Sequence, residues 1–330
     1  MTAVIASTSG AASGRSRSRA RPALTTGGFW LGLLPFAVFV AVSFLVPIGF
    51  VIADAFRKTE TFQPKDAQGN ALRDPVTQQF VTEKHTSYTL DNVRSSLHGV
   101  YHTALLNSIE LSALTAVIGT VCGLLLAYAV VSGRGRILRR VMPTFSAVAA
   151  NFGGVPLAFI FIASLDANSG VVSVFLQEHL HFSLQDDLHF QLQGMAGMAL
   201  VYLYFLVPLM VLVMLPAFEG LKPQWGEAAE NLGASRWQYW RYVAGPVLLP
   251  TVLGALLLLF CSAFSAYATA YAVNHTFPLI PTEIKVVLSG NVVAGQGNLG
   301  AALAFDMIVF VLPLTLIYQA LQRRTSRWLA

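Results

Sequence analysis

One polar segment of the chain, residues 223–250, lies between two long apolar runs and has residue types whose spacing suits a docking helix. Its sequence is PQWGEAAENLGASRWQYWRYVAGPVLLP. The first residue is proline, which favours a first helical turn, and Glu227 then falls near the positive end of the helix dipole. Gly233 can adopt the left-handed conformation that ends such a helix. We expect the small side chains of Ala228 and Ala229 to form a flat docking face.

A second helix is predicted to follow at once. Ser235 and Gln238 have the spacing of a capping box, in which each side chain bonds the backbone N–H of the other residue. The helix is expected to run until Pro246, because proline lacks the N–H donor that the next turn requires. The segment is therefore predicted to be a helix–turn–helix at a membrane surface.

One carboxyl group lies deep in an apolar run. Asp306 is eight residues beyond Asn298, which is roughly 12 Å into a helix that rises ~1.5 Å per residue. An unpaired charge there is expensive, so the group must face other helices or water, or be protonated. Two roles stay open, a structural hydrogen bond or attraction of a cationic group on a solute. For the second role the expected neighbours are Ser265, Tyr267 and Tyr271.

The sequence NFGGVP, at residues 151–156, interrupts another apolar run. Its proline removes one backbone hydrogen bond, and its glycines ease bending. A broken helix at membrane depth is tolerated where it lines a cavity. Asn151, Gly153 and Gly154 are therefore predicted to line a translocation route.

The histidines and cysteines give little sign of metal chemistry. All seven histidines fall in segments predicted to lie outside the membrane. His179, His181 and His189 are conceivable metal ligands, but solvated imidazoles in a polar loop are the interpretation that we favour. Cys122 and Cys261 fall inside apolar runs and are interpreted as small hydrophobic residues. No metal or cofactor is predicted.

Composition sets the class of protein. Hydrophobic residues make up 55% of the chain, charged residues only 11%, and the mean hydropathy is +0.61. These values indicate an all-α integral membrane protein embedded in a lipid bilayer. The formal net charge is +5, but the basic residues cluster at the ends of apolar runs. No nucleic-acid partner is therefore predicted, and the basic residues are read as topology signals.

Six apolar runs reach the ~20 residues that a membrane-spanning helix needs. They are placed at residues 29–51, 105–131, 141–165, 194–217, 247–273 and 298–320. The corresponding division is a disordered basic cytoplasmic tail (1–28), the first span with an external loop (29–104), a core domain of five helices (105–320) that includes a cytoplasmic loop at 217–246, and a cytoplasmic tail (321–330). The external loop is expected to end in a short amphipathic segment at 88–97.

Lys and Arg counts predict the orientation of the spans. Segment 132–140 has four arginines, the loop at 217–246 has Lys222, Arg236 and Arg241, and the C-terminus has three arginines. In contrast, 166–193 has no basic residue and 274–297 has only Lys285. Because cytoplasmic loops carry the excess of basic residues, both termini are predicted to be cytoplasmic. The first external loop, with six basic and six acidic residues, is an exception to this pattern.

Two spans contain small residues at helical spacing, which lets neighbouring helices approach closely. In the second span these residues are Ser112, Ala116, Gly119, Gly123 and Ala127. In the fifth they are Ser262, Ala266 and Ala270.

The cytoplasmic loop resembles the EAA signature of ABC-importer permeases. Glu227-Ala228-Ala229, three residues, Gly233, nine residues and VAGP match the pattern EAA, G and I-x-L-P. Gly245 stands where the family has Leu and is expected to loosen packing there. The resemblance covers residues 30–320 and is strongest to permeases that import polyamines, aminophosphonates, ferric iron or thiamine, on segments such as LLNSIELSALTAVIGTVCGLLLAYAVV and NLGAALAFDMIVFVLPL. Asp306 departs from that group, in which an uncharged residue is expected.

The resemblance implies a type I importer with six spans in the cytoplasmic (inner) membrane. It implies a second permease subunit, a cytoplasmic ABC ATPase dimer and an external solute-binding protein as partners. The residues expected to couple to the ATPase are Glu227, Ala228, Ala229, Leu232, Gly233 and Pro246. The chain lacks the sequence G-x-x-x-x-G-K-[ST], so ATP hydrolysis is assigned to a partner and the chain is not expected to be an enzyme.

Several alternatives stay open. The favoured solute is a polyamine or a similar aminophosphonate, and sugar or iron permeases are alternatives within the family. An ion-coupled secondary transporter with Asp306 as its relay is an alternative from another class. A membrane-embedded enzyme is disfavoured, because no His, Cys, Asp or Glu set at the span ends has catalytic spacing.

Overall fold

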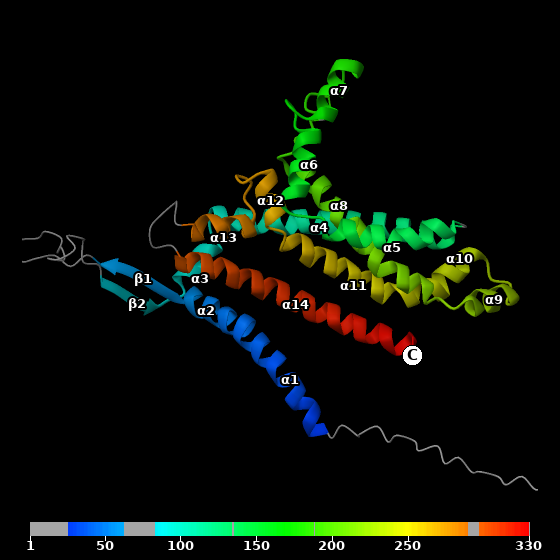
Figure 1. The fold of residues 1–330 in the computed structure, drawn as a ribbon, viewed down its shortest axis with the longest axis horizontal. Coiled ribbons are helices and arrows are strands. Elements are labelled where there is room, and N and C mark those ends of the chain that lie inside the picture. Colours follow the sequence, from blue (N-terminus) through cyan, green and yellow to red (C-terminus); the bar gives the residue numbers. More distant parts are fainter. Residues whose placement is uncertain (1–25, 63–82, 134, 188, 290–296, 330) are drawn as a thin grey trace, which may run out of the picture. The chain divides into compact units, whose positions relative to one another are not determined.

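The structure is a computed structural model that describes residues 26–62, 83–133, 135–187, 189–289 and 297–329 (Figure 1). The chain divides into two units, Met1–Gly49 and Phe50–Ala330. The helices of the first half are α1 (Thr26–Val40), the π turn η1 (Ala41–Leu45), α2 (Val46–Ala55), α3 (Asp91–Ser96), α4 (Val100–Ser132), α5 (Arg136–Asn151) and α6 (Val155–Leu165). Those of the second half are α7 (Val171–Leu180), α8 (Met195–Glu219), α9 (Pro223–Asn231), α10 (Arg236–Tyr239), the π turn η2 (Trp240–Ala244), α11 (Gly245–Phe264), α12 (Ala268–Val273), α13 (Ile280–Leu288) and α14 (Gly297–Leu329).

The first unit contains most of an apolar helical stretch, which continues past Gly49 along the chain. The span predicted at residues 29–51 corresponds to the apolar stretch Leu33–Ala55. Within it the chain makes a π turn, in which the N–H of Val46 donates to the carbonyl of Ala41. The predicted tail at residues 1–28 lies outside the described residues up to residue 25, and α1 begins at Thr26.

The second unit contains the remaining spans. Four helices are long and apolar enough to cross a bilayer, namely Val100–Ser132, Met195–Glu219, Arg236–Phe264 and Asn298–Leu321. Ile137–Asn151 and Val155–Leu165 form a further pair, bent by 94° at the sequence NFGGVP. The described residues therefore have five spans, or six if the bent pair is one span, as predicted.

The core of this unit forms around α8, which packs against α4, α5 and α11. The predicted small-residue stripe of α4 is entirely buried and faces α8 and α11. Gly123 marks the closest approach, because a Cβ there would lie 2.4 Å from the Cβ of Met210. The stripe predicted in the fifth span is different, since Ala270 belongs to the separate helix α12.

The fifth span also has different limits from the predicted 247–273. It begins at Arg236, inside the predicted cytoplasmic loop, and ends at Phe264. The helix ends there although no proline or glycine follows. At its end the N–H of Ser265 donates to the carbonyl of Cys261, and the N–H of Ala266 donates to the carbonyl of Ala263. Residues 268–273 then form α12.

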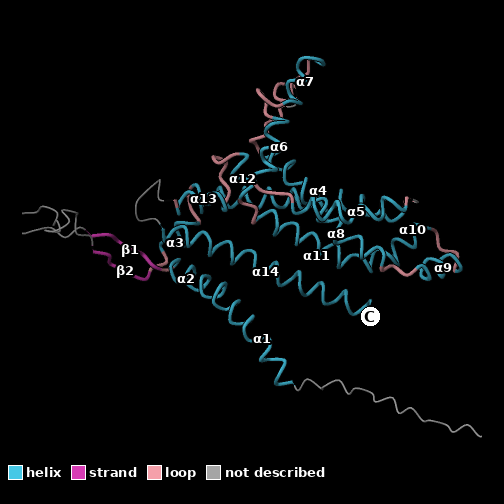
Figure 2. The backbone as a smooth tube through the Cα atoms, in the orientation of Figure 1, coloured by secondary structure: helices cyan, strands magenta, loops and turns pink. Residues whose placement is uncertain are grey.

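The segment after the first span contains an antiparallel hairpin of β1 (Arg57–Phe62) and β2 (Glu83–Tyr88), drawn in magenta in Figure 2. The sequence analysis did not predict these strands. The predicted amphipathic segment at 88–97 corresponds to α3. The side-chain amide of Asn92 on α3 donates to the carbonyls of Arg57 at 2.6 Å and Ala55 at 3.3 Å, so α3 and the hairpin are joined.

Candidate functional site: the loop between the fourth and fifth spans

The loop begins with α9, whose end has the predicted left-handed glycine. Gly233 has φ +75°. Its N–H donates to the carbonyl of Glu230, and the N–H of Ala234 donates to the carbonyl of Ala229, both at 2.9 Å. These two bonds are those of a Schellman motif, which satisfies the last carbonyl groups of a helix. Gly233 therefore turns the chain sharply from α9 to α10.

The capping box of the next helix is present as predicted. The N–H of Ser235 donates to the side-chain oxygen of Gln238 at 2.7 Å, and the N–H of Gln238 donates to the hydroxyl oxygen of Ser235 at 3.3 Å. With the Schellman motif, this box fixes both sides of the turn. The predicted helix–turn–helix is confirmed.

The predicted helix end at Pro246 is wrong, because α10 continues through η2 into α11. In this π turn the N–H of Gly245 donates to the carbonyl of Trp240, five residues back. The hydrogen bonds have therefore already shifted from the fourth to the fifth residue back before Pro246, which has no N–H to donate. A Cβ on residue 245 would lie 2.6 Å from that carbonyl oxygen. Gly245, expected to loosen packing, therefore permits a continuous helix.

Aromatic rings anchor this continuous helix to the bundle. The ring of Trp240 lies 5.3 Å from Tyr128 of α4 and 6.4 Å from Phe218 of α8, between centroids and nearly edge to face. Such pairs contribute about 0.5–1.5 kcal/mol beyond their buried area. This cluster was not predicted from the sequence, although the four aromatic residues at 237, 239, 240 and 242 in a polar loop were a signal.

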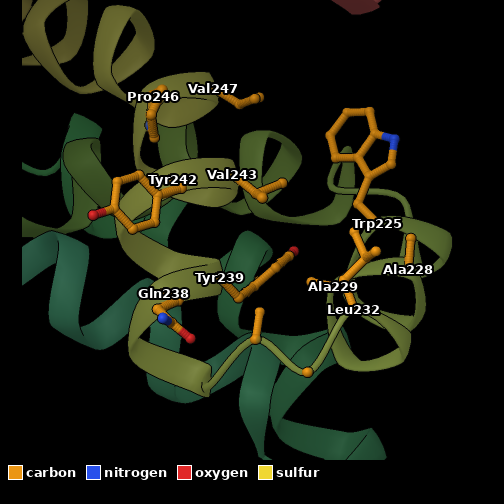
Figure 3. A pocket seen from close by; sticks show the side chains of 12 residues that line it. Trp225, Ala228, Ala229, Leu232, Gln238, Tyr239, Tyr242, Val243, Pro246 and Val247 are labelled. Carbon is orange, nitrogen blue, oxygen red and sulfur yellow. The ribbon is translucent and has the colours of Figure 1, made fainter.

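A pocket of ≈ 670 Å³ lies between α9 and the continuous helix, and its lining is largely apolar (Figure 3). Five of the six predicted coupling residues line it together: Ala228, Ala229, Leu232, Gly233 and Pro246. The residues of the lining that were not predicted to take part in coupling are Trp225, Ala234, Gln238, Tyr239, Tyr242, Val243 and Val247. The predicted residues belong mainly to the α9 wall, whereas most of the missed ones form the opposite wall.

The exposure of the loop residues refines the expected docking face. Leu232 is 87% exposed, whereas Ala229 is only 8% exposed. Ala228 and Glu227 are exposed, but Glu227 does not line the pocket. The flat face expected from both alanines is thus reduced to Ala228, because Ala229 packs inside the loop. An ion pair between Arg139 of α5 and Glu219, at 3.2 Å, lies at the base of the loop.

The broken third span meets α12. Gly154, at the break, has φ +78°, and its N–H donates to the hydroxyl oxygen of Thr269 at 2.8 Å. Gly153 lies beside the same hydroxyl group. The side chain of Asn151 donates back to the carbonyl of Ala147 at 2.8 Å. Thr269 was missed by sequence reasoning, because its partner is 115 positions away.

The other predicted pathway residues fall into separate groups. Tyr267 and Tyr271 are neighbours, with ring centroids 5.4 Å apart. Desolvation, and then Tyr271, raise the pKa of the Tyr267 hydroxyl, so this group stays neutral at physiological pH. Ser265 bonds the carbonyl of Cys261. Asp306 is hydrogen-bonded to Ser96 of α3. This contact differs from the predicted one with the tyrosines.

Known proteins resemble the chain in sequence. It is 23% identical over 211 residues to the "Putative ferric transport system permease protein FbpB 1" of Haemophilus influenzae, over 62% of this chain and 32% of that protein. It is 24% identical over 212 residues to the "Spermidine/putrescine transport system permease protein PotC homolog" of Mycoplasma pneumoniae, over 64% and 68% of the two chains. The chain thus spans about a third of the length of the ferric relative.

A solved structure shares the fold. It is that of a bacterial ABC transporter involved in the import of the acidic polysaccharide alginate, with a TM-score of 0.62 and 17% identity over 90% of this chain and 95% of that chain. A bacterial alginate ABC transporter, also with a TM-score of 0.62, has been solved in complex with an alginate pentasaccharide-bound periplasmic protein. The predicted type I permease fold is therefore confirmed. Residues 119–327 also match the family described as "Binding-protein-dependent transport system inner membrane component", and the chain belongs to this family of multi-pass inner-membrane permeases of ABC importers.

Proposed function

We propose that the chain forms half of the translocation pathway of an ATP-driven importer of a small organic cation of the polyamine class. In this proposal the loop formed by α9, α10 and η2 is the attachment point for a separate ATPase. Energy from ATP hydrolysis reaches the pathway as movement of that loop.

The observation that carries the proposal is the continuity of α10, η2 and α11. One helical segment, Arg236–Phe264, extends from the loop through the bilayer. Because the helix does not end at Pro246, force applied at the loop is transmitted along a single rod. Trp240 holds this rod against α4 and α8, so rotation of the rod also moves the neighbouring spans. Alternating access by such rocking is an established mode of transport.

The ATPase is expected to contact α9 and the apolar pocket behind it. Leu232, 87% exposed, and the exposed Glu227 and Ala228 present a mixed apolar and acidic surface. A solute-binding protein is the expected external partner, as in the complex solved for the alginate transporter. The second permease subunit is either a copy of this chain or a related one.

The comparisons support a polyamine-like solute through relatives of similar length. The PotC homologue of Mycoplasma pneumoniae aligns over about two thirds of both chains, whereas only 32% of the ferric permease is covered. The ferric relative keeps iron as the second candidate. Family membership does not favour the ion-coupled alternative.

The test is uptake of radiolabelled spermidine and of ferric iron by proteoliposomes that contain the chain with its ATPase and binding protein. We expect spermidine uptake that requires ATP on the side of the membrane where the ATPase is bound. Glu227→Lys is expected to reduce uptake at least tenfold and to release the ATPase during copurification, while membrane insertion is unchanged. Iron uptake alone would replace the solute assignment.

A matched control separates coupling from a general effect of charge reversal. Glu178 is an exposed glutamate on α7, outside the predicted spans and far along the chain from the loop. Glu178→Lys should leave the ATPase bound and uptake within about twofold of the wild type. Normal uptake by Glu227→Lys, or uptake by the chain without an ATPase, would contradict the proposal.

A further inference from the structure

Asp306 is tied to a segment from the other end of the chain. It lies in the last span, Asn298–Leu321. One of its oxygens, Oδ2, is 2.5 Å from the hydroxyl oxygen of Ser96 on α3, and the two residues are 210 positions apart. Ser96 is only 1% exposed. This contact, which we call the 96–306 clasp, joins the external segment to the last span.

The surroundings of the clasp are apolar. Ala55, Ala301 and Ala302 form a buried cluster, against which Val93 and Phe305 pack. The rings of Phe56 and Phe305 meet edge to face with centroids 5.2 Å apart. Asp306 itself is half-buried, and a carboxylate among these apolar side chains loses part of its hydration, which is costly.

Charged groups on the neighbouring elements do not neutralise Asp306. On α3, Asp91 and Arg94 are exposed. On β1, the guanidinium group of Arg57 bonds Asp54 and Tyr88. The last span also packs against α13, which has Glu283 and Lys285, and against α11, whose sequence has no charged residue. Among the residues whose side chains the structure describes, no cation forms an ion pair with Asp306.

The two hydrogen bonds of Ser96 bear on the protonation state of Asp306. Its Oγ lies 2.8 Å from the carbonyl oxygen of Val93 and 2.5 Å from Oδ2 of Asp306. A serine hydroxyl has one proton to donate, and a carbonyl oxygen can only accept. If the Ser96 proton bonds Val93, the proton between Ser96 and Asp306 must come from the carboxyl group. A neutral acid satisfies all three oxygens and removes the cost of a charge.

We propose that Asp306 is a protonated, neutral positioning residue, which donates to Ser96 and so fixes α3 against the last span. Ser96 in turn donates to Val93, a serine-to-backbone bond that is common in helices. Because Asn92 bonds Ala55 and Arg57, α3 also holds the base of the hairpin. The carboxyl group then neither attracts a cationic solute nor relays protons during transport.

The first experiment rests on the proposed function, because it measures ATP-driven spermidine uptake. Asp306→Asn keeps a neutral donor of the same shape and is expected to retain at least half of wild-type uptake. Asp306→Leu removes the donor and is expected to reduce uptake at least fivefold. Ser96→Ala should also reduce uptake, whereas Ser95→Ala and Asp91→Asn, at exposed neighbours on α3, should not. Equal loss in Asp306→Asn and Asp306→Leu would overturn the proposal, because it would show that the charge or the titration is needed.

The second experiment does not depend on transport. Infrared spectra of the purified protein near neutral pH should contain the C=O stretch of a protonated carboxyl group that Asp306→Asn removes and Asp91→Asn does not. A spectrum without that difference would overturn the proposal. If the wild type moves no spermidine but the band is present, the solute assignment fails and the clasp stands.

In the exchanged variant Ser96→Asp/Asp306→Ser, recovery of the stability lost in either single variant would show that the two side chains act as a pair.

Discussion

At the residue scale, the shape of the loop depends on Gly233. Nothing lies within 4 Å of a Cβ built at this position, so a side chain there meets no steric obstacle. The constraint is the backbone, because φ is +75° and a left-handed conformation costs a residue with a Cβ about 1–2 kcal/mol. The glycine is therefore needed for its conformation.

This distinction gives a testable prediction for two substitutions at Gly233 that differ in how readily they adopt the left-handed conformation. Gly233→Val should disturb the Schellman bonds, weaken ATPase copurification and reduce ATP-driven uptake several-fold. Gly233→Asn should be tolerated, because asparagine adopts the left-handed conformation most readily among residues with a side chain. Uptake and copurification of the ATPase measure both effects. Equal activity of the two variants would show that the turn conformation is unimportant for coupling.

Residue identities predicted one half of the loop better than the other. Gly233, Ser235 and Gln238 have short-range preferences that act within four residues, and the structure confirms their conformations. The wall formed by Tyr239, Tyr242 and Val247 was missed, although helical spacing places these residues together. Because the helix was predicted to end at Pro246, its helical face was not extended across that residue.

At the element scale, the two prolines that follow π turns explain why a helix end was predicted wrongly. In η1 and in η2, the last N–H bonds a carbonyl five residues back, and the next residue is Pro47 or Pro246. A proline removes the ordinary hydrogen bond to the fourth residue back. Where the π turn has already shifted the hydrogen bonds to the fifth residue back, the helix continues through the proline. A rule that ends every helix at a proline does not take the π turn into account.

Other elements depended on contacts that a sequence does not specify. The lengths and positions of the long spans followed from apolar runs, and the bend at NFGGVP followed from its glycines and proline. The end of the fifth span at Phe264 had no such local signal. The bond from Gly154 to Thr269 joins segments 115 positions apart, and only the packed bundle places them together.

The closeness of α4 and α8 leads to a prediction at this scale. A Cβ at Gly123 would lie 2.4 Å from the Cβ of Met210 and 2.9 Å from the backbone oxygen of Val207. Gly123→Ala must therefore push the helices apart, and overpacking of this kind costs about 1–3 kcal/mol. Thermal unfolding in detergent should show a clearly lowered midpoint.

Gly119 provides the matched control on the same helix face. Its Cβ would meet the mobile end of Leu259 at 3.2 Å, which a small side-chain movement relieves. Gly119→Ala is therefore expected to lower the midpoint by less than half as much as Gly123→Ala. If Gly119→Ala were the more harmful substitution, the contact of α4 with α8 would not be the tightest of the two.

At the scale of the whole molecule, the proposed function requires the loop and the external segments to lie on opposite sides of the bilayer. Basic residues predict this orientation, since segment 166–193 has none and the loop has Lys222, Arg236 and Arg241. Only a loop in the cytoplasm can meet an ATPase. The orientation is therefore the assumption on which the coupling proposal depends most directly.

Single cysteines at two exposed positions test the orientation. In a background with Cys122→Ala and Cys261→Ala, we place one cysteine at Leu232, 87% exposed on the loop, or at Val171, 72% exposed on α7. A maleimide that does not cross membranes should label Val171→Cys in right-side-out vesicles and Leu232→Cys only in inside-out vesicles. Added ATPase should protect Leu232→Cys and leave Val171→Cys unchanged. Labelling of Leu232→Cys from the outside would place the loop on the side of the membrane that has no ATPase. The helix that begins at Arg236 could then not be moved by an ATPase, and the coupling proposal would fail.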